Sequence, residues 1–348
     1  MNRSLNILLP AGLICWFSSG TPPSPQFVLP ASTTAVNTTH SYRTNETSQK
    51  LGQTLNLNGF SMLCNQAEIT VEIRSDGWRL QGKDFIAWVD DAVNSVLSYY
   101  GKYPIKRTRI IIDQKEGRGI MGGLTSFDED SQSGVIEIAM GKDTQPEDLT
   151  NTWTLTHEMV HLTFPLVNDQ YNWLSEGIAT YTEPLGRMRR GIISREQVWK
   201  DLVEGTPKGQ PQAGDLGLNR TNTWGRTYWG GAIYCLLADI EIRKRSENRF
   251  GLEHALRGIM ESGANAESDL LSAPEILTLG DLSTRNSVLT ELYEAMKETP
   301  VTVDLSKIWQ ELGITVCGDS IKFDDNAPLA NIRKAIENGH DRGELASR

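Results

Sequence analysis

The chain has 348 residues, of which 39% are hydrophobic and 22% are charged. This is the balance of a globular protein, with enough length for one large domain or two ordinary ones. The formal net charge is −10, from 34 basic and 44 acidic residues. Because nucleic-acid binding needs a basic surface, this acidic balance argues against a nucleic-acid partner.

The first twenty residues have the pattern of an export signal. Arg3 precedes a mostly apolar run at residues 5–17, and small residues follow at 18–20, as in a signal peptide with its cleavage site. The run is shorter than the roughly 20 apolar residues that cross a bilayer. The alternative interpretation is a disordered or packed N-terminus. We expect residues 1–20 to be a signal peptide and the mature protein to be periplasmic or extracellular, with no stable membrane span.

Residues 21–59 are rich in Pro, Ser, Thr and Asn. This composition has too little apolar content for a core and predicts a flexible linker. The folded body is expected over residues 60–340. Apolar residues on one stripe predict a helix at 85–100. Strand patterns flank that helix, at 69–73 before it and at 109–113 and 134–140 after it.

From residue 147 onward, helical patterns dominate. Helices are expected at 153–164, at 175–183 with a stop at Pro184, and at 228–245, which is long and strongly apolar. Shorter helical patterns occupy 252–260, 288–296, 305–312 and 329–336, with a strand pattern at 314–323. A strand-rich part over 60–145 followed by a helix-rich part over 146–340 predicts an α+β fold.

Four cysteines occur, and no two have the close spacing of a metal site. Any metal must therefore use histidine and carboxylate ligands. Cys64 and Cys317 lie beside strand-like segments and can pair in an oxidising compartment. Cys235 lies in an apolar helical pattern and is expected to be a buried thiol.

The pattern that carries chemistry is His-Glu-Met-Val-His at residues 157–161. Residues four apart lie on the same face of a helix, so the imidazoles of His157 and His161 can reach one metal ion. Glu158 is turned away by one residue. It can take a proton from a metal-activated water that attacks a carbonyl, then deliver the proton to the leaving amine. The alternative interpretation is a pair of surface histidines on an amphipathic helix.

A catalytic zinc takes a third protein ligand and keeps one position open. Glu176 follows His161 after fourteen residues, enough chain for a second helix to fold back onto the first. Asp169, in a loop-like segment, is an alternative third ligand. Glu183 can be a hydrogen-bond partner of the ligands rather than a ligand itself. Glu176 can instead merely complement the start of a helix that Ser175 or a neighbour caps.

The pattern at 157–161, followed by Trp-Leu-Ser-Glu-Gly at 173–177, resembles the gluzincin metallopeptidases, the clan of thermolysin and aminopeptidase N. The resemblance implies that His157, His161 and Glu176 bind zinc. It implies Glu158 as the general base. It also implies a thermolysin-like zincin domain, in which a small mixed sheet packs beside a mainly helical subdomain.

A second segment, Tyr-Trp-Gly-Gly-Ala at 228–232, is similar to a tyrosine-bearing helix of aminopeptidase N and, more closely, of glycyl aminopeptidases. That similarity implies that Tyr228 donates its hydroxyl to the oxyanion formed during hydrolysis. The alternative is an aromatic packing residue at a helix start. The resemblance covers about residues 119–336.

One departure from these families bears on the substrate. Their aminopeptidases carry an acid in a Gly-rich strand, where it grips the free amine of the substrate. The corresponding segment here is Gly-Gly-Leu-Thr-Ser at 122–126, with Thr125 where the acid is expected. Strict aminopeptidase activity is therefore not expected. The strand can still pair with an extended peptide through its backbone.

Tryptophans gather around these motifs, and we expect them in the core rather than on a sugar-binding platform; they are Trp153, Trp173, Trp199, Trp224 and Trp229. His254 is expected to be structural or solvated. The sequence thus predicts an exported zinc metallopeptidase that acts on a peptide or protein. The alternatives are a catalytically inactive zincin-fold binding protein and a metal-dependent hydrolase of non-peptide amides or cell-wall material.

Overall fold

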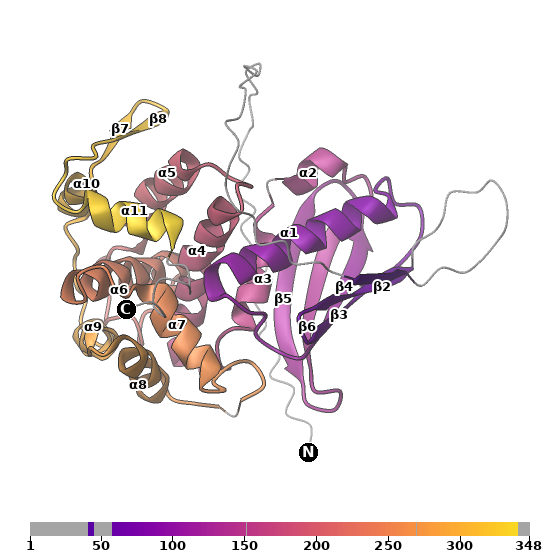
Figure 1. Ribbon diagram of the computed structural model, residues 1–348, viewed down its shortest axis with the longest axis horizontal. Helices are drawn as coiled ribbons and strands as arrows, with labels where there is room; N and C mark the ends of the chain where they lie inside the picture. The colour runs from indigo at the N-terminus through magenta and orange to yellow at the C-terminus, as the bar shows by residue number, and fades with distance from the viewer. Residues whose placement is uncertain (1–40, 45–57, 151, 269, 340–348) are drawn as a thin grey trace. The chain divides into compact units, whose positions relative to one another are not determined.

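The computed structural model describes residues 41–44, 58–150, 152–268 and 270–339. They form an α+β fold in which a mixed sheet lies beside a helical part (Figure 1). The expected signal peptide, residues 1–20, lies outside the described residues. None of the described helices is long and apolar enough to cross a membrane.

The sheet has six strands in the order β1-β2-β3-β4-β6-β5. Their bounds are β1 (Ser41–Thr44), β2 (Gly59–Cys64), β3 (Ala67–Ile73), β4 (Arg107–Lys115), β5 (Ile120–Asp128) and β6 (Ser133–Gly141). The β3–β4 and β4–β6 pairs are parallel and the other pairs are antiparallel. The consecutive isoleucines Ile110, Ile111 and Ile112 are buried in β4, as expected for a strand covered on both faces.

Strand β1 corrects the prediction of a linker without structure over residues 21–59. It pairs with β2 at one edge of the sheet. Its sequence, Ser-Tyr-Arg-Thr, contains two residue types that favour strands. A short pairing segment of this kind carries too few apolar residues to stand out in a polar stretch.

Helix α1 (Gly82–Tyr100) connects the parallel strands β3 and β4 and lies across one face of the sheet (Figure 1). Its apolar stripe, which includes Phe85, Val89 and Val93, is buried. The helix ends as expected at Gly101, whose φ of 75° lies in the left-handed region that glycine adopts without strain.

The helical part follows the sheet. Its α-helices are α2 (Pro146–Thr150), α3 (Thr154–His161), α4 (Asn172–Arg189), α5 (Arg195–Gly205), α6 (Gly231–Arg245), α7 (Leu252–Glu261), α8 (Ala273–Thr284), α9 (Val288–Met296), α10 (Leu305–Leu312) and α11 (Ala330–Asn338). Short 3₁₀ turns form η1 (Asp169–Tyr171) and η2 (Thr206–Gly209), and η3 (Gly225–Gly230) is a π-helical turn. A hairpin of β7 (Ile314–Cys317) and β8 (Ser320–Phe323) precedes α11. The sequence did not predict α2, α5 and α8, nor the strand β2.

Helix α4 runs through Pro184, so the predicted stop there is wrong. Proline removes one helical hydrogen bond, but packing after the proline holds the helix. Leu185 is buried, and the Ser98 hydroxyl of α1 donates to the Gly186 carbonyl at 2.8 Å. A Cβ at Gly186 would lie 2.6 Å from the Ser95 carbonyl oxygen. Close contact with α1 therefore outweighs the local break.

All three cysteines in the described residues are free. Cys64 is buried in β2, whereas Cys317 ends β7 in the separate two-stranded hairpin. The suggested Cys64–Cys317 disulfide is therefore absent from the structure. Cys235 is buried in α6, as predicted.

Candidate active site

The two histidines lie on α3, a helix in the interior of the molecule. His157 and His161 lie one turn apart on the same face, with ring centroids 4.9 Å from each other. His157 is only 5% exposed. Every residue of α3 before His161 is buried. This contradicts the alternative of two surface histidines on an amphipathic helix.

Helix α4 brings Glu176 to the same point. One carboxylate oxygen, Oε2, lies 3.2 Å from His157 Nε2 and 3.6 Å from His161 Nε2. Because α4 begins at Asn172, Glu176 lies beyond the first turn, so its expected place at a helix start is wrong. Ser175 is not the cap. Its hydroxyl lies 2.9 Å from His161 Nδ1, where a hydrogen bond fixes the ring's orientation.

Close backbone contact sets the position of α4 against α6. A Cβ on Gly177 would lie 2.3 Å from the Cα of Gly231, and one on Gly231 would lie 2.1 Å from the Trp173 carbonyl oxygen. Only glycine fits at both points. The contact places Glu176, next to Gly177, beside the helical turn that ends at Gly230.

The donor set fits a zinc ion. Among the described residues, His157, His161 and Glu176 are the one group of three such side chains whose ligand atoms all lie within 4.8 Å of one another. Two imidazoles and one carboxylate are a typical catalytic zinc set, with the fourth position left open. Asp169 lies in η1 and is not part of this group.

The charges of this cluster also favour a cation. Burial raises the pKa of Glu176, but His161 and His157 outweigh it and hold the pKa well below its usual range. Burial lowers the pKa of His161, while Glu176 raises it to about 8 in the metal-free protein. An ionised carboxylate between two imidazoles therefore recruits positive charge to this point.

Strand β5 positions Glu158. The Thr125 hydroxyl donates to Glu158 Oε2 at 2.7 Å and lies 2.9 Å from the Glu158 carbonyl oxygen. A Cβ at Gly123 would lie 2.6 Å from Glu158 Cγ, so glycine is needed where the strand passes the carboxylate. The sequence analysis named Thr125 only because it stands where the related aminopeptidases have an acid. Its contact with Glu158 depends on a strand–helix approach that no local pattern reveals.

Tyr228 lies in the π-helical turn η3, not at the start of α6 as expected. Its ring faces that of His157 at 6.3 Å, with an angle of 19° between the planes. Burial raises the pKa of the phenol well above its usual value, and the nearby charges of Glu176 and Glu158 add to this effect. The hydroxyl is therefore protonated, and a hydrogen bond to Glu176 also favours that state.

A buried ion pair fastens that turn. Arg226 Nε lies 2.8 Å from Asp215 Oδ2, and both side chains are almost completely buried. Arg226 Nη1 also donates to the Gly209 carbonyl. The chain just before Tyr228 is thus fixed. A π-helical turn here is notable because such turns recur at functional sites.

Two tryptophans depart from the prediction of a core role. Trp173 and Trp199 are buried, as expected, but Trp153 is 52% exposed and Trp224 is 61% exposed. The Trp153 ring lies 5.1 Å from that of His157. The Trp224 ring lies 6.0 Å from that of Tyr228.

Two other candidates have different partners. Glu183 pairs with Arg187 at 2.9 Å, and burial raises the pKa of Glu183 to about 7. Its partner is therefore an arginine rather than the histidines. His254 Nδ1 accepts from the Gly251 backbone N–H at the start of α7, which is the structural one of the two expected roles.

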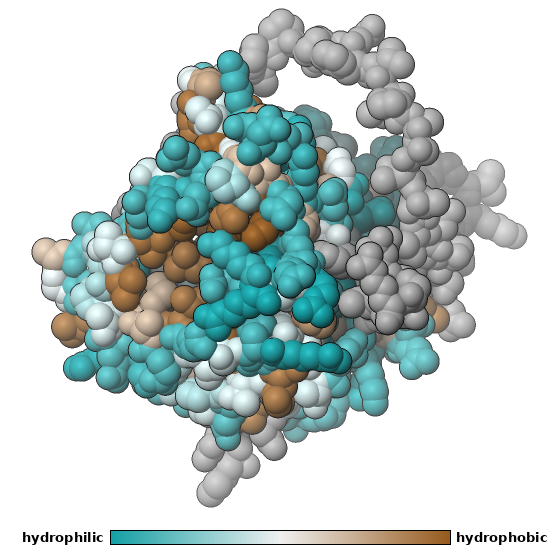
Figure 2. Space-filling view, turned by 60° about the vertical axis from the view of Figure 1, so that its left-hand side comes forward, coloured by the Kyte–Doolittle hydropathy of each residue, from teal (hydrophilic) through white to brown (hydrophobic). Residues whose placement is uncertain are grey.

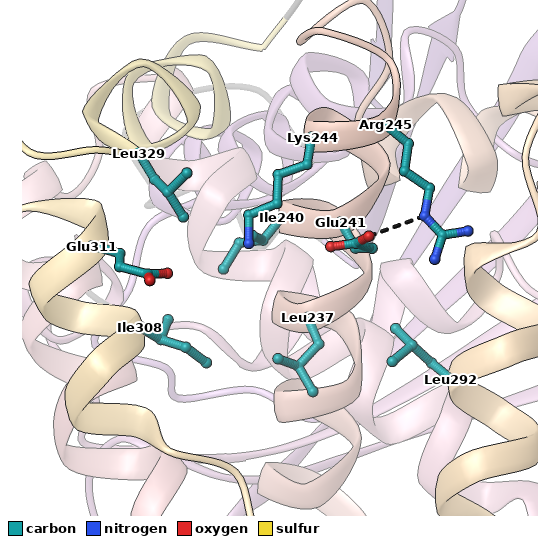
Figure 3. A pocket seen from close by; sticks show the side chains of 9 residues that line it. All are labelled: Leu237, Ile240, Glu241, Lys244, Arg245, Leu292, Ile308, Glu311 and Leu329. Carbon is teal, nitrogen blue, oxygen red and sulfur yellow. Dashed lines mark hydrogen bonds and ion pairs between the residues drawn. The ribbon is translucent and has the colours of Figure 1, made fainter.

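A hollow of about 260 Å³ lies elsewhere on the surface. Aliphatic side chains of α6, α9 and α10 surround it, together with charged groups such as Lys244 and Glu311 (Figure 3). On the face shown in Figure 2, hydrophobic side chains gather in a depression bordered by hydrophilic ones. None of the residues around the hollow belongs to the histidine–glutamate cluster.

No known family model and no curated protein sequence matches this chain. Solved structures do match. An aminopeptidase N family protein from Idiomarina loihiensis has a TM-score of 0.54 at 13% identity, over 80% of this chain and 56% of that chain. A two-domain M1 zinc metallopeptidase bound to L-arginine gives 0.48 at 12% identity, over 76% and 53% of the two chains. An M1 zinc metallopeptidase from Deinococcus radiodurans gives 0.44 at 13%, with the same coverage of 76% and 53%.

The likeness to the Idiomarina protein, at 13% identity, shows the fold. The chain therefore shares the α+β fold of the matched part of that protein, a small mixed sheet beside a helical part. It spans about half the length of the solved structures it matches.

Proposed function

We propose that this protein is an exported zinc-dependent metallopeptidase that hydrolyses peptide bonds in a peptide or protein substrate. The observation that carries the proposal is the convergence of His157, His161 and Glu176 within 4.8 Å, with the charge of Glu158 near enough to raise the pKa of His161. The domain responsible would be residues 60–340. The fold shared with an aminopeptidase N family protein supports a peptidase reaction.

His157, His161 and Glu176 would hold the metal. When bound, zinc supplies a Lewis acid that polarises the carbonyl of the scissile bond and lowers the pKa of water. The remaining requirements are a base for the attacking water, a donor for the developing oxyanion and a proton for the leaving amine.

Glu158 meets the first and last of these requirements. Thr125 occupies Oε2 at 2.7 Å, which fixes the carboxylate and leaves Oε1 as the oxygen that would accept the proton of the attacking water. The water's proton passes to Glu158 and then to the leaving nitrogen. Tyr228 meets the remaining requirement. Its protonated hydroxyl donates to the oxyanion, so it stabilises charge that develops only in the transition state.

The substrate would be cut internally or trimmed by another rule. Thr125 offers no charge to a free amine, and its hydroxyl is already committed to Glu158. A nucleic-acid substrate is disfavoured by the net charge of −10. The pattern of residues 1–20 supports export. N-terminal sequencing of the mature protein tests it, with a first residue close after residue 20 expected.

Hydrolysis of a mixed peptide library, read out by mass spectrometry, tests the proposal. We expect zinc-dependent cleavage that a chelator abolishes. Glu158→Gln should lower the rate by at least about a hundredfold with zinc still bound. The matched control is Asp169→Asn, an exposed acid near the start of α4, which should keep both zinc and activity. If the wild type binds zinc but cleaves no peptide, the protein is instead an inactive binding protein of this fold.

A further inference from the structure

Trp153 and Trp224 lie at the site with much of their surface in contact with solvent, at 52% and 61% exposed. Burying an aromatic ring is strongly favourable, so large exposed aromatics beside a site indicate surface that a ligand covers. In contrast, Trp173 and Trp199 are buried and donate their N–H groups to Asn219 and Glu337. Neither indole N–H of the exposed pair has a hydrogen-bond partner among the described residues.

The two exposed rings occupy equivalent places. Each precedes a site residue by four positions, Trp153 before His157 and Trp224 before Tyr228, so each ring lies one helical turn from that residue. The ring centroids are 5.1 Å apart in the first pair and 6.0 Å apart in the second. Since His157 and Tyr228 also face each other at 6.3 Å, the four rings form one continuous row.

This row runs past the point where hydrolysis would occur. His157 contacts Glu176 at 3.2 Å, and Tyr228 is the proposed oxyanion donor. A substrate group seated at the catalytic residues therefore has an indole at each end of the row. Both are apolar surfaces large enough to cover an aromatic or long aliphatic side chain.

We propose that Trp153 and Trp224 are specificity-determining residues. They form the apolar walls of the site and select peptide segments that carry a large aromatic or aliphatic side chain beside the scissile bond. This inference rests on the proposed function and names its substrate class. A peptide is favoured over a sugar, because the ring neighbours of these indoles are His157 and Tyr228, which the site already uses, rather than free polar groups that would bind sugar hydroxyls.

Binding, rather than turnover, tests the inference. The zinc-loaded Glu158→Gln protein would be titrated by calorimetry with two capped hexapeptides, acetyl-Gly-Ala-Ala-Phe-Ala-Gly-amide and the same peptide with Ala in place of Phe. We expect the Phe peptide to bind about tenfold more tightly. Adding Trp153→Ala and Trp224→Ala together should remove most of that preference. The two single variants show how much each tryptophan contributes to it. Replacing both by Phe should keep it.

The matched control is Leu282→Ala on α8, where an equally apolar side chain is 71% exposed away from the site residues. It should leave both affinities unchanged. Melting temperatures should be unaffected in all of these variants, because the side chains removed are exposed.

Three results would overturn the inference. The two peptides could bind the unmutated site equally. The double alanine variant could keep the full preference for Phe. Alternatively, chitotriose could bind more tightly than either peptide and lose its binding in the double variant, which would assign the tryptophans to a sugar. The proposed function fails separately, through absent zinc or absent hydrolysis, since the Phe preference can exist in a protein that does not cleave.

Discussion

Two buried clusters of ionisable side chains lie in the helical part, and they differ in how their charges are balanced. In the first, Arg243 is 0% exposed and lies 2.8 Å from Asp239 and 2.8 Å from Glu253. The Tyr181 hydroxyl adds a hydrogen bond to Asp239 at 3.0 Å. This cluster contains its own cation and joins α4, α6 and α7.

The second cluster has no such cation. His157, His161 and Glu176 are metal-ligand types that converge on one point, and the only positive charge available among them is a proton on an imidazole. A buried charge persists only when it is paired or binds a metal. The first cluster is therefore complete in the sense that its cation is part of the fold, whereas the second is incomplete, with side chains of metal-ligand types and no cation of its own.

The largest expected effect comes from breaking the complete cluster. Arg243→Leu leaves Asp239 and Glu253 buried without their cation, which should lower the free energy of unfolding by about 3–5 kcal/mol. Arg245→Leu, on the same helix but with exposed partners, is the matched control and should cost less than about 1 kcal/mol. Urea unfolding followed by circular dichroism measures both. Equal effects of the two variants would contradict the comparison.

Breaking the incomplete cluster should instead weaken zinc binding. Glu176→Gln removes the anionic ligand, and we expect zinc affinity to fall by at least about a hundredfold. Without zinc, the variant should unfold somewhat more easily than the wild type, because the lowered pKa of Glu176 means that its charge stabilises the folded state. A competition titration with a zinc indicator measures the affinity. A variant that keeps full zinc affinity would show that Glu176 is not a ligand.

Lowering the pH should weaken zinc binding at the second cluster, which is a further difference between the two. Metal binding needs neutral imidazoles, and the pKa of His161 is raised to about 8 in the metal-free protein. Zinc must therefore displace a proton below about pH 8, and its affinity should fall about tenfold for each unit from there to pH 6. Titrations at several pH values measure the slope. A flat profile would indicate that His161 does not bind the metal.

The smallest effect on zinc affinity is expected at Ser175, which orients the imidazole of His161. Ser175→Ala removes the hydroxyl 2.9 Å from His161 Nδ1. Loss of such a support typically weakens metal binding by about 10–100-fold, and we expect the lower end because the ring stays packed in the site. Ser175→Thr, which keeps a hydroxyl, should restore affinity. If the alanine variant binds zinc as the wild type does, the hydrogen bond plays no part in holding the ring.

The parts predicted well from sequence are those set by local periodicity. The predicted helix at 305–312 matches α10 at both ends, and α1 and α9 follow their apolar stripes closely. The convergence of His157 with His161 likewise follows from a spacing of four residues on a helix. These features need no knowledge of what the helix packs against.

The parts predicted poorly depend on contacts between elements. Helix α4 passes Pro184 because α1 holds it, and Tyr228 lies in a π-helical turn fixed by Arg226. The contact of Thr125 with Glu158 needs β5 to pass beside α3. The exposure of Trp153 and Trp224 cannot be predicted from the sequence either, since a large aromatic residue gives the same pattern in a core as beside a site.

The most direct measurement is X-ray absorption at the zinc edge of the purified, zinc-loaded protein. We expect one zinc per chain, bound by nitrogen and oxygen ligands at about 2.0–2.2 Å, with two imidazoles and no sulfur. The Glu176→Gln sample should show altered or lost zinc coordination. Sulfur ligands at about 2.3 Å, or a wild-type protein that takes up no zinc, would contradict the assignment of His157, His161 and Glu176 as the metal site.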